Sequence, residues 1–482
     1  MNLKIILRSL GMLLICEAIA LIPPTLVAAW YKDGDLVSFL ITIGIIVMVA
    51  VPLLIIRPVS KHIYARDGFA IVALGWLMMA FFGAFPFYIS GAIPSFVDAF
   101  FESSSGLTTT GSSILSVIEG LPRGILFWRS FTHWIGGMGI LVLTIAILPS
   151  LGIGSIQVMK AESPGPIVSR IVPKLGQTAK LLYSIYLGIT LLEIVLLLVA
   201  GMSFYDACIH AFSTVGTGGF SNMNASVGAY NSPLIDWIIT FFMIVCGINF
   251  SLYYLILKGD LKSFWKDQEL RLYIGILGSA ILLISCDLLL KNQYTSLGDA
   301  LRFSSFQAAS VMTTTGYATA DYTKWSMFSQ IILLLLMVVG GCAGSTGGGI
   351  KVSRFLIGFK SMKYAFMQIL HPNGCYIVRM NGKKVPDKTV VDVLTYFFIY
   401  TIVFIVGVVI ISLNGFDIGT TVTSVLTTLN NVGPGVGIVG PSGNFSSFTD
   451  LSKFTFSILM IIGRIEIYPI LLLLIPSCWK KN

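Results

Sequence analysis

Four short strings, each containing glycine and three of them also threonine, have the composition needed to coordinate a cation that has lost its water shell. Backbone carbonyls can replace that water without adding a net charge that would trap the ion. Glycine permits the positive φ that turns a carbonyl inward, at no steric cost. The strings recur at intervals of about 100 residues, which indicates a repeated structural unit. They are Thr108-Thr109-Thr110-Gly111, Thr217-Gly218-Gly219-Phe220, Thr313-Thr314-Thr315-Gly316-Tyr317 and Asn430-Asn431-Val432-Gly433.

Three residues of each string are the candidate cation ligands. They are Thr109, Thr110, Gly111, Thr217, Gly218, Gly219, Thr314, Thr315, Gly316, Asn431, Val432 and Gly433. The second string also allows another register, Thr214-Val215-Gly216-Thr217-Gly218, which is similar to the potassium-channel string TVGYG. We favour Gly219, because Gly219-Phe220 then matches Gly316-Tyr317.

The elements around these strings predict how they are positioned. Each string closes a short, half-apolar segment that lies between two long hydrophobic runs. Such a segment is too short to cross a bilayer, but it suits a re-entrant helix buried in protein. We expect these short helices at Phe96–Leu107, Tyr205–Val215, Leu297–Met312 and Asp417–Leu429, the third with about one extra turn. An aspartate near each start is expected to cap the helix; these residues are Asp98, Asp206, Asp299 and Asp417.

Composition restricts the chain to one class. Of 482 residues, 55% are hydrophobic and only 11% are charged, whereas a soluble protein carries about 25% charged residues. We therefore expect an all-α polytopic membrane protein, with two N-terminal helices and four helix–pore helix–filter–helix repeats in a pseudo-fourfold arrangement. The ten candidate spans are Leu10–Trp30, Val37–Ile56, Ile71–Tyr88, Phe131–Leu148, Leu181–Met202, Trp237–Leu257, Leu272–Leu290, Met327–Gly349, Val393–Leu413 and Phe454–Leu474. The expected units are residues 1–66 for the N-terminal helices and 67–160, 161–268, 269–364 and 365–482 for the repeats.

Charge distribution predicts the orientation. With the N-terminus in the cytoplasm, most of the 31 Lys and Arg residues fall on the cytoplasmic side, as the positive-inside rule requires. The net charge of +9 is then a topology signal, and we expect no nucleic-acid partner. Acids outnumber bases on the outer side, where they would concentrate cations. The alternative is that this imbalance only mirrors the positive-inside rule.

The matching strings resemble the Trk/Ktr/HKT superfamily of cation transporters, and specifically its Trk-type membrane subunit. Two further matches are Gly340-Gly341-Cys342-Ala343-Gly344-Ser345-Thr346-Gly347-Gly348-Gly349 and Gly463-Arg464-Ile465-Glu466. The resemblance covers essentially the whole chain. It implies K⁺ uptake across a bacterial plasma membrane through a single-chain pore, with K⁺ as the transported ion and no covalent cofactor. It also implies a homodimer, membrane lipid as surroundings and a cytosolic nucleotide-binding regulatory subunit of the TrkA type.

Two features are expected to form a gate beneath the filter. Glycine weakens a helix by about 1 kcal/mol relative to alanine, so the Gly340–Gly349 run predicts an irregular loop within the membrane. Arg464 is the only base inside a span, where its charge would raise the barrier to a cation. The gate candidates are Gly344, Ser345, Thr346, Gly347, Gly348 and Arg464. The alternatives are tight helix packing for the glycines and, for Arg464, a structural salt bridge to Glu466, Asp287, Glu17 or Glu193.

Two other functions are alternatives to a K⁺ pore. A secondary transporter of another monovalent cation, or one coupled to Na⁺ or H⁺, commonly has two inverted halves, whereas this chain has four parallel copies. A membrane enzyme is disfavoured, because the four histidines form no recognisable catalytic motif. His62, His133, His210 and His371 are expected to be scattered structural or membrane-edge residues.

Overall fold

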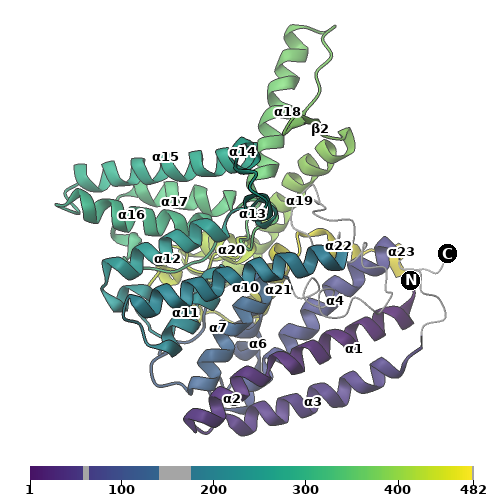
Figure 1. The fold of residues 1–482 in the computed structure, drawn as a ribbon. Helices are drawn as coiled ribbons and strands as arrows, with labels where there is room; N and C mark the ends of the chain where they lie inside the picture. The colour runs from purple at the N-terminus through teal and green to yellow at the C-terminus, as the bar shows by residue number, and fades with distance from the viewer. Residues whose placement is uncertain (58–63, 140–174, 480–482) are drawn as a thin grey trace.

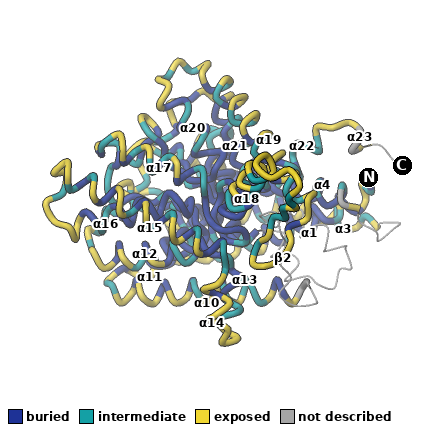
Figure 2. Tube along the Cα trace, turned by 90° about the horizontal axis from the view of Figure 1, so that it is seen from above, coloured by how far each residue is buried: buried dark blue, intermediate teal, exposed yellow. Residues whose placement is uncertain are grey.

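The computed structural model describes residues 1–57, 64–139 and 175–479. Within these ranges almost every ordered element is a helix (Figure 1), and the two strands, β1 (Arg379–Met380) and β2 (Lys383–Lys384), form one small antiparallel hairpin. Seen from above, α15–α17, α10–α12, α19–α21 and the N-terminal helices surround one centre (Figure 2). The predicted all-α, pseudo-fourfold fold is confirmed.

The N-terminal helices pack against the first repeat. Helices α1 (Leu3–Ala20) and α2 (Ile22–Tyr31) together make one span, and α3 (Leu36–Ile55) makes the next. A Cβ added at Gly11 of α1 would lie 2.8 Å from the Cβ of Leu53 in α3. Glycine at this position therefore allows the two backbones to approach closely, as is usual where helices pack in membranes.

The four repeats have the same order of elements. The first long helices are α4 (Ala65–Gly83), α10 (Leu175–Val199), α15 (Gln268–Leu290) and α19 (Asp387–Ile411). The short pore helices are α6 (Phe96–Leu107), α11 (Phe204–Val215), α16 (Leu297–Met312) and α20 (Ile418–Asn430). The second long helices begin with α7 (Arg123–Gly137), α12 (Pro233–Cys246), α17 (Met327–Val339) and α21 (Asp450–Arg464). The extra turn expected in the third copy is confirmed, since α16 has 16 residues and α6 has 12.

The remaining described helices and turns lie between or after these elements. They are α5 (Phe85–Ile89), α13 (Phe250–Leu257), α14 (Leu261–Lys266), α18 (Val352–Leu370), α22 (Tyr468–Leu473), α23 (Pro476–Trp479) and the 3₁₀ turns η2 (Ser226–Tyr230), η3 (Tyr322–Lys324), η4 (Ser412–Asn414) and η5 (Gly437–Val439). Helix α18 and the following hairpin project away from the body of the molecule (Figure 1).

The second long helix is interrupted in repeats two to four, whereas the sequence predicted an irregular loop only at Gly340–Gly349. Among the described residues, six helices are long and apolar enough to cross a membrane, or seven if the pair α12 and α13, bent by 95°, is counted as one. Helix α17 ends at Val339, and α21 ends at Arg464 before left-handed Glu466 and Ile467. Glycines at or beside these ends explain the breaks, because glycine stabilises a helix poorly. Residues 140–148 of the span predicted at Phe131–Leu148 lie outside the described residues.

The capping prediction is correct only in the fourth repeat. The N-cap side chains of α6, α11 and α16 are Ser95, Ser203 and Ser296, each of which accepts a backbone N–H. In α20 the cap is Asp417, whose Oδ2 accepts from the N–H of Thr420 at 2.9 Å. The other aspartates lie three residues into the helix, where a carboxylate interacts favourably with the positive end of the helix dipole.

Burial in this chain differs from that in a soluble protein, because many large apolar side chains are exposed and many polar ones are buried. The most apolar window of the α19 span is only 17% buried (Figure 2). In contrast, the hydroxyl-bearing residues Ser103, Ser104 and Ser105 of pore helix α6 are fully buried. Apolar side chains facing outward suit a hydrocarbon solvent, while the polar interior surrounds the four strings that bear on function.

Candidate ion pathway

The four Gly/Thr strings, which we call the filter segments, share one unusual backbone conformation. The residue two before each filter glycine is left-handed: φ is +54° at Thr109, +56° at Thr217, +60° at Thr314 and +56° at Asn431. The glycines follow with φ of +79° at Gly111, +77° at Gly219, +82° at Gly316 and +101° at Gly433. A β-branched residue at positive φ is a steric outlier, and such strain is typical of functional sites. The same left-handed conformation recurs in all four copies, three times at a threonine and once at Asn431, and so identifies the segments as equivalent.

Helix termination explains how each segment acquires this conformation. The N–H after each left-handed residue reaches back five residues to a pore-helix carbonyl, as in the Schellman motif. Thr110 donates to Ser105 at 2.9 Å, Gly218 to Ser213 at 2.8 Å, Thr315 to Ser310 at 2.8 Å and Val432 to Thr427 at 3.0 Å. The chain therefore leaves every pore helix by the same turn, and the partly negative helix C-terminus faces the start of its filter segment.

The four filter segments form a closed ring. A Cβ added at Gly111 would lie 2.0 Å from the carbonyl oxygen of Gly218, and one at Gly219 would lie 2.0 Å from that of Thr315. A Cβ at Gly316 would lie 2.1 Å from the carbonyl oxygen of Val432. The ring closes at Gly433, whose Cβ would lie 2.7 Å from the carbonyl oxygen of Thr110. Two reasons therefore require glycine at each of these positions. A side chain would clash with a carbonyl of the neighbouring segment, and the positive φ is unfavourable for residues with a Cβ.

This geometry also determines the register of the second segment and explains its many glycines. Thr217 and Gly219 are the left-handed pair, so Gly219 is the equivalent of Gly111. A Cβ at Gly218 would lie 2.3 Å from the ring of His133. Gly218 therefore makes room for an imidazole that packs directly behind the segment.

Comparison with known proteins identifies the family. The family model TrkH, described as a cation transport protein, matches residues 37–481. The Trk system potassium uptake protein TrkH of Escherichia coli K12 is 38% identical over 487 residues, with 100% of both chains covered. This chain belongs to the TrkH family. TrkG of the same organism is 34% identical, covering 100% of this chain and 99% of its own. The crystal structure of the potassium transporter TrkH from Vibrio parahaemolyticus matches with a TM-score of 0.89 and 36% identity, covering both chains fully.

In this TrkH-family protein the predicted gate residues lie against the start of the filter. The N–H of Gly348 donates to Thr314 Oγ1 at 2.5 Å, and the N–H of Gly349 donates to the carbonyl of Asn430 at 3.0 Å. A Cβ at Gly347 would lie 2.8 Å from the carbonyl oxygen of Thr313. The loop between α17 and α18 thus contacts the third and fourth filter segments directly.

The rest of the loop is anchored to the second repeat. The carbonyl of Gly344 accepts from the N–H of Phe250 at 3.0 Å, and Thr346 Oγ1 donates to the carbonyl of Cys246 at 3.2 Å. Ser345 Oγ donates within the loop, to the carbonyl of Cys342 at 2.6 Å. The loop therefore fills the break between α12 and α13.

Arg464 joins this loop to the first repeat. Its guanidinium donates to the carbonyl of Thr346 at 2.7 Å and to those of Gly136 and Gly137 at 2.6 Å each. Glu466, which was considered as its partner, pairs with Arg354. Arginine suits this position, because its planar fork can donate to several carbonyls at once.

Lys351 is a buried base at the loop that was not among the predicted gate residues. Its residue is 2% exposed, its φ is +83°, and its Nζ donates to the carbonyl of Gly347. A lysine two residues after a glycine run predicted to lie within the membrane was the signal that could have revealed it.

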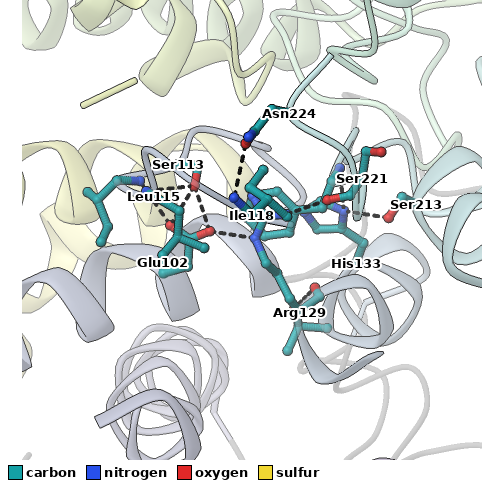
Figure 3. Close-up of polar contacts among 12 residues, drawn as sticks. Glu102, Ser113, Leu115, Ile118, Arg129, His133, Ser213, Ser221 and Asn224 are labelled. Carbon is teal, nitrogen blue, oxygen red and sulfur yellow. Dashed lines mark hydrogen bonds and ion pairs between the residues drawn. The ribbon is translucent and has the colours of Figure 1, made fainter. Parts of the chain in front are cut away.

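Two of the four histidines, which were expected to be scattered structural or membrane-edge residues, occupy buried structural positions. His133 and His210 are fully buried beside the filter. The ring of His133 stacks on Phe220 with centroids 4.2 Å apart, and its Nδ1 lies 3.3 Å from Ser213 Oγ (Figure 3). His210 Nε2 lies 3.1 Å from Ser221 Oγ. His371 is exposed, and His62 lies outside the described residues.

Proposed function

We propose that this protein takes up K⁺ across the membrane through the ring of carbonyls that the four filter segments present. The observation that carries the proposal is the ring itself, in which alternate left-handed residues and four close glycine–carbonyl contacts repeat around one axis. Carbonyl dipoles can replace the hydration shell of K⁺ without binding it too tightly for release. The membrane potential would supply ~2.3 kcal/mol per charge per 100 mV.

We propose that the loop between α17 and α18, together with Arg464, gates this pathway. The loop contacts Thr314 and Asn430 at the start of two filter segments. Arg464 connects the loop to the carbonyls of Gly136 and Gly137. Two fixed positive charges, those of Arg464 and Lys351, would raise the barrier to a cation while the loop is in place.

Orientation and partners are proposals of the same kind. The positive-inside rule supports a cytoplasmic N-terminus in a bacterial plasma membrane. The family resemblance supports a homodimer regulated by a cytosolic nucleotide-binding subunit of the TrkA type. Light scattering of the purified protein in detergent, with and without such a subunit, tests both assemblies.

A second candidate is uptake coupled to H⁺ or to Na⁺. Glu17 of α1 favours coupling to H⁺ over coupling to Na⁺. Its side chain is fully buried, and its carboxyl oxygens have no hydrogen-bond partner among the described residues. A transported proton needs such an intramembrane acid. If K⁺ flux responds to an imposed pH gradient and Glu17→Gln abolishes that response, the coupled mechanism is correct; flux that follows voltage alone excludes it.

The deciding experiment is cation flux into liposomes that contain the purified protein. K⁺, Rb⁺, Na⁺ and Li⁺ are compared for the wild type, Gly316→Ser and Gly275→Ser. Gly316→Ser should loosen or abolish K⁺ selectivity, because its Cβ would meet the carbonyl of Val432. Gly275→Ser is the matched control, because a Cβ at Gly275 meets nothing within 4 Å. Absence of any cation flux, even with a regulatory subunit added, would refute the pore.

A further inference from the structure

A buried ion pair lies at the far end of the filter, where the chain leaves the ring. Glu102 of pore helix α6 and Arg129 of α7 are 0% and 2% exposed. Arg129 Nε donates to Glu102 Oε1 at 2.6 Å (Figure 3). Neither residue belongs to the carbonyl ring or to the gate.

Glu102 holds the chain that follows the first filter segment. Its Oε1 accepts from Ser113 Oγ at 2.9 Å, and its Oε2 accepts from the N–H of Ile114 at 3.0 Å (Figure 3). Ser113 is two residues beyond the filter glycine Gly111. The carboxylate therefore ties Ser113 and Ile114, which follow the first filter segment, to the pore helix of the same repeat.

Arg129 holds the chain that follows the second filter segment. Its Nη1 donates to the carbonyl of Ser221 at 2.9 Å, and its guanidinium carbon lies 3.6 Å from the centroid of the Phe220 ring. Both residues come directly after Gly219. One ion pair makes all these contacts. It therefore links the residues that follow the first filter segment to those that follow the second.

The equivalent positions in the other repeats carry no such pair. Nine residues before the filter glycines stand Glu102, His210, Gln307 and Ser424. His210 contacts Ser221 Oγ, and Gln307 Nε2 donates to the carbonyl of Ala320 at 3.2 Å. Ser424 donates within its own helix, to Thr421. In three of the four repeats, the side chain at this position therefore contacts the chain that follows the filter glycine. Only in the first repeat is that side chain part of an ion pair.

We propose that Glu102 and Arg129 are positioning residues that set the cation selectivity of the filter. This inference rests on the proposed K⁺ pore. Their hydrogen bonds resist inward movement of the first two segments, and so keep the carbonyls of Thr110, Gly111, Gly218 and Gly219 from closing around a smaller cation. A buried ion pair is often no more stabilising than an apolar pair of similar size, and can instead specify one conformation.

The test is the K⁺/Na⁺ flux ratio of Glu102→Gln and Arg129→Gln in liposomes. Each change should lower the ratio by about tenfold while cation flux persists, since filter groups need placement to within ~0.5 Å. The double variant should be no less selective than either single one, because the two residues act as a unit. The matched control is Asp98→Asn, which removes another ion pair of α6, formed 2.6 Å from Lys453. It should leave the ratio unchanged.

The outcomes separate this inference from the proposed function. A wild type that conducts no cation refutes the pore itself. A selective wild type, with Glu102→Gln folded and equally selective, overturns only the role of the ion pair. Should Glu102→Gln fail to fold, Arg129→Lys decides, because lysine keeps the charge but lacks the fork that reaches both Glu102 and Ser221. An unchanged ratio in Arg129→Lys overturns the proposal, and a lowered ratio supports it.

Discussion

The side-chain amide of Asn431 donates a 2.9 Å hydrogen bond to the hydroxyl of Thr110, and so joins the last filter segment to the first across 321 positions of sequence. The same Nδ2 donates to the carbonyl of Met460 in α21 at 2.8 Å. The equivalent residues in the other three segments are threonines. Asparagine tolerates a left-handed backbone and is long enough to make both contacts.

Asn431→Asp should therefore weaken the closure of the ring. The substitution keeps a residue that tolerates positive φ but replaces the amide donor with an acceptor. We expect a loss of about 1–3 kcal/mol of stability, measured as a lower thermal unfolding temperature in detergent, together with a lower K⁺/Na⁺ flux ratio. Asn292→Asp is the control, since Asn292 is exposed and also left-handed, with φ of +52°. Equal effects of the two changes would contradict the bridging role.

Alanine at the filter glycines should impair K⁺ flux in a graded order. The added Cβ would lie 2.0 Å from a neighbouring carbonyl at Gly111 and Gly219, but 2.7 Å away at Gly433. Gly433→Ala should accordingly retain the most flux. The measurement is ⁸⁶Rb⁺ uptake at equal protein density. An order in which Gly433→Ala is the most damaging would show that these contacts do not limit the pore.

The hydrogen bond between Thr314 and the loop that joins α17 to α18 predicts different effects of threonine-to-valine substitutions at Thr314 and at Thr109. Thr314→Val removes the acceptor of the Gly348 N–H, whereas Thr109 Oγ1 is buried without a hydrogen-bond partner among the described residues. Thr314→Val should raise basal K⁺ flux in the absence of any regulatory subunit by roughly fivefold, the lower range of an allosteric coupling. Thr109→Val should leave basal flux near the wild-type value. The idea fails if both variants behave alike.

Lys351→Gln should also raise basal flux, because it removes a fixed positive charge whose ammonium donates to the carbonyl of Gly347. We expect an increase of roughly fivefold, seen as K⁺ leak from loaded liposomes. Lys363→Gln is the control, since Lys363 is exposed on α18. Unchanged leak in Lys351→Gln would remove this lysine from the gate.

Prediction from sequence succeeded where the signal is local. Pore helices α6 and α16 begin and end where the hydrophobic pattern placed them, and the family and fold class are correct. The error at Asp98 arose because Ser95, three residues earlier, caps the helix instead, and sequence alone does not rank two cap candidates within one turn. The breaks after Cys246 and Arg464 were missed because hydropathy averages over a window and cannot register a single turn, whereas the glycine run revealed the break after Val339.

The amino-acid sequence by itself determined the class of protein, the four repeats and the glycines, because hydropathy, period and φ preference act within one short stretch of chain. Only the tertiary structure decided which carbonyl each glycine faces and that His133 lies behind Gly218. It also decided that Lys351 lies buried in the loop between α17 and α18 and that Arg129 reaches the second filter segment. These relationships join residues from different repeats, and they arise only when packing around a common axis brings distant backbone groups within hydrogen-bonding distance.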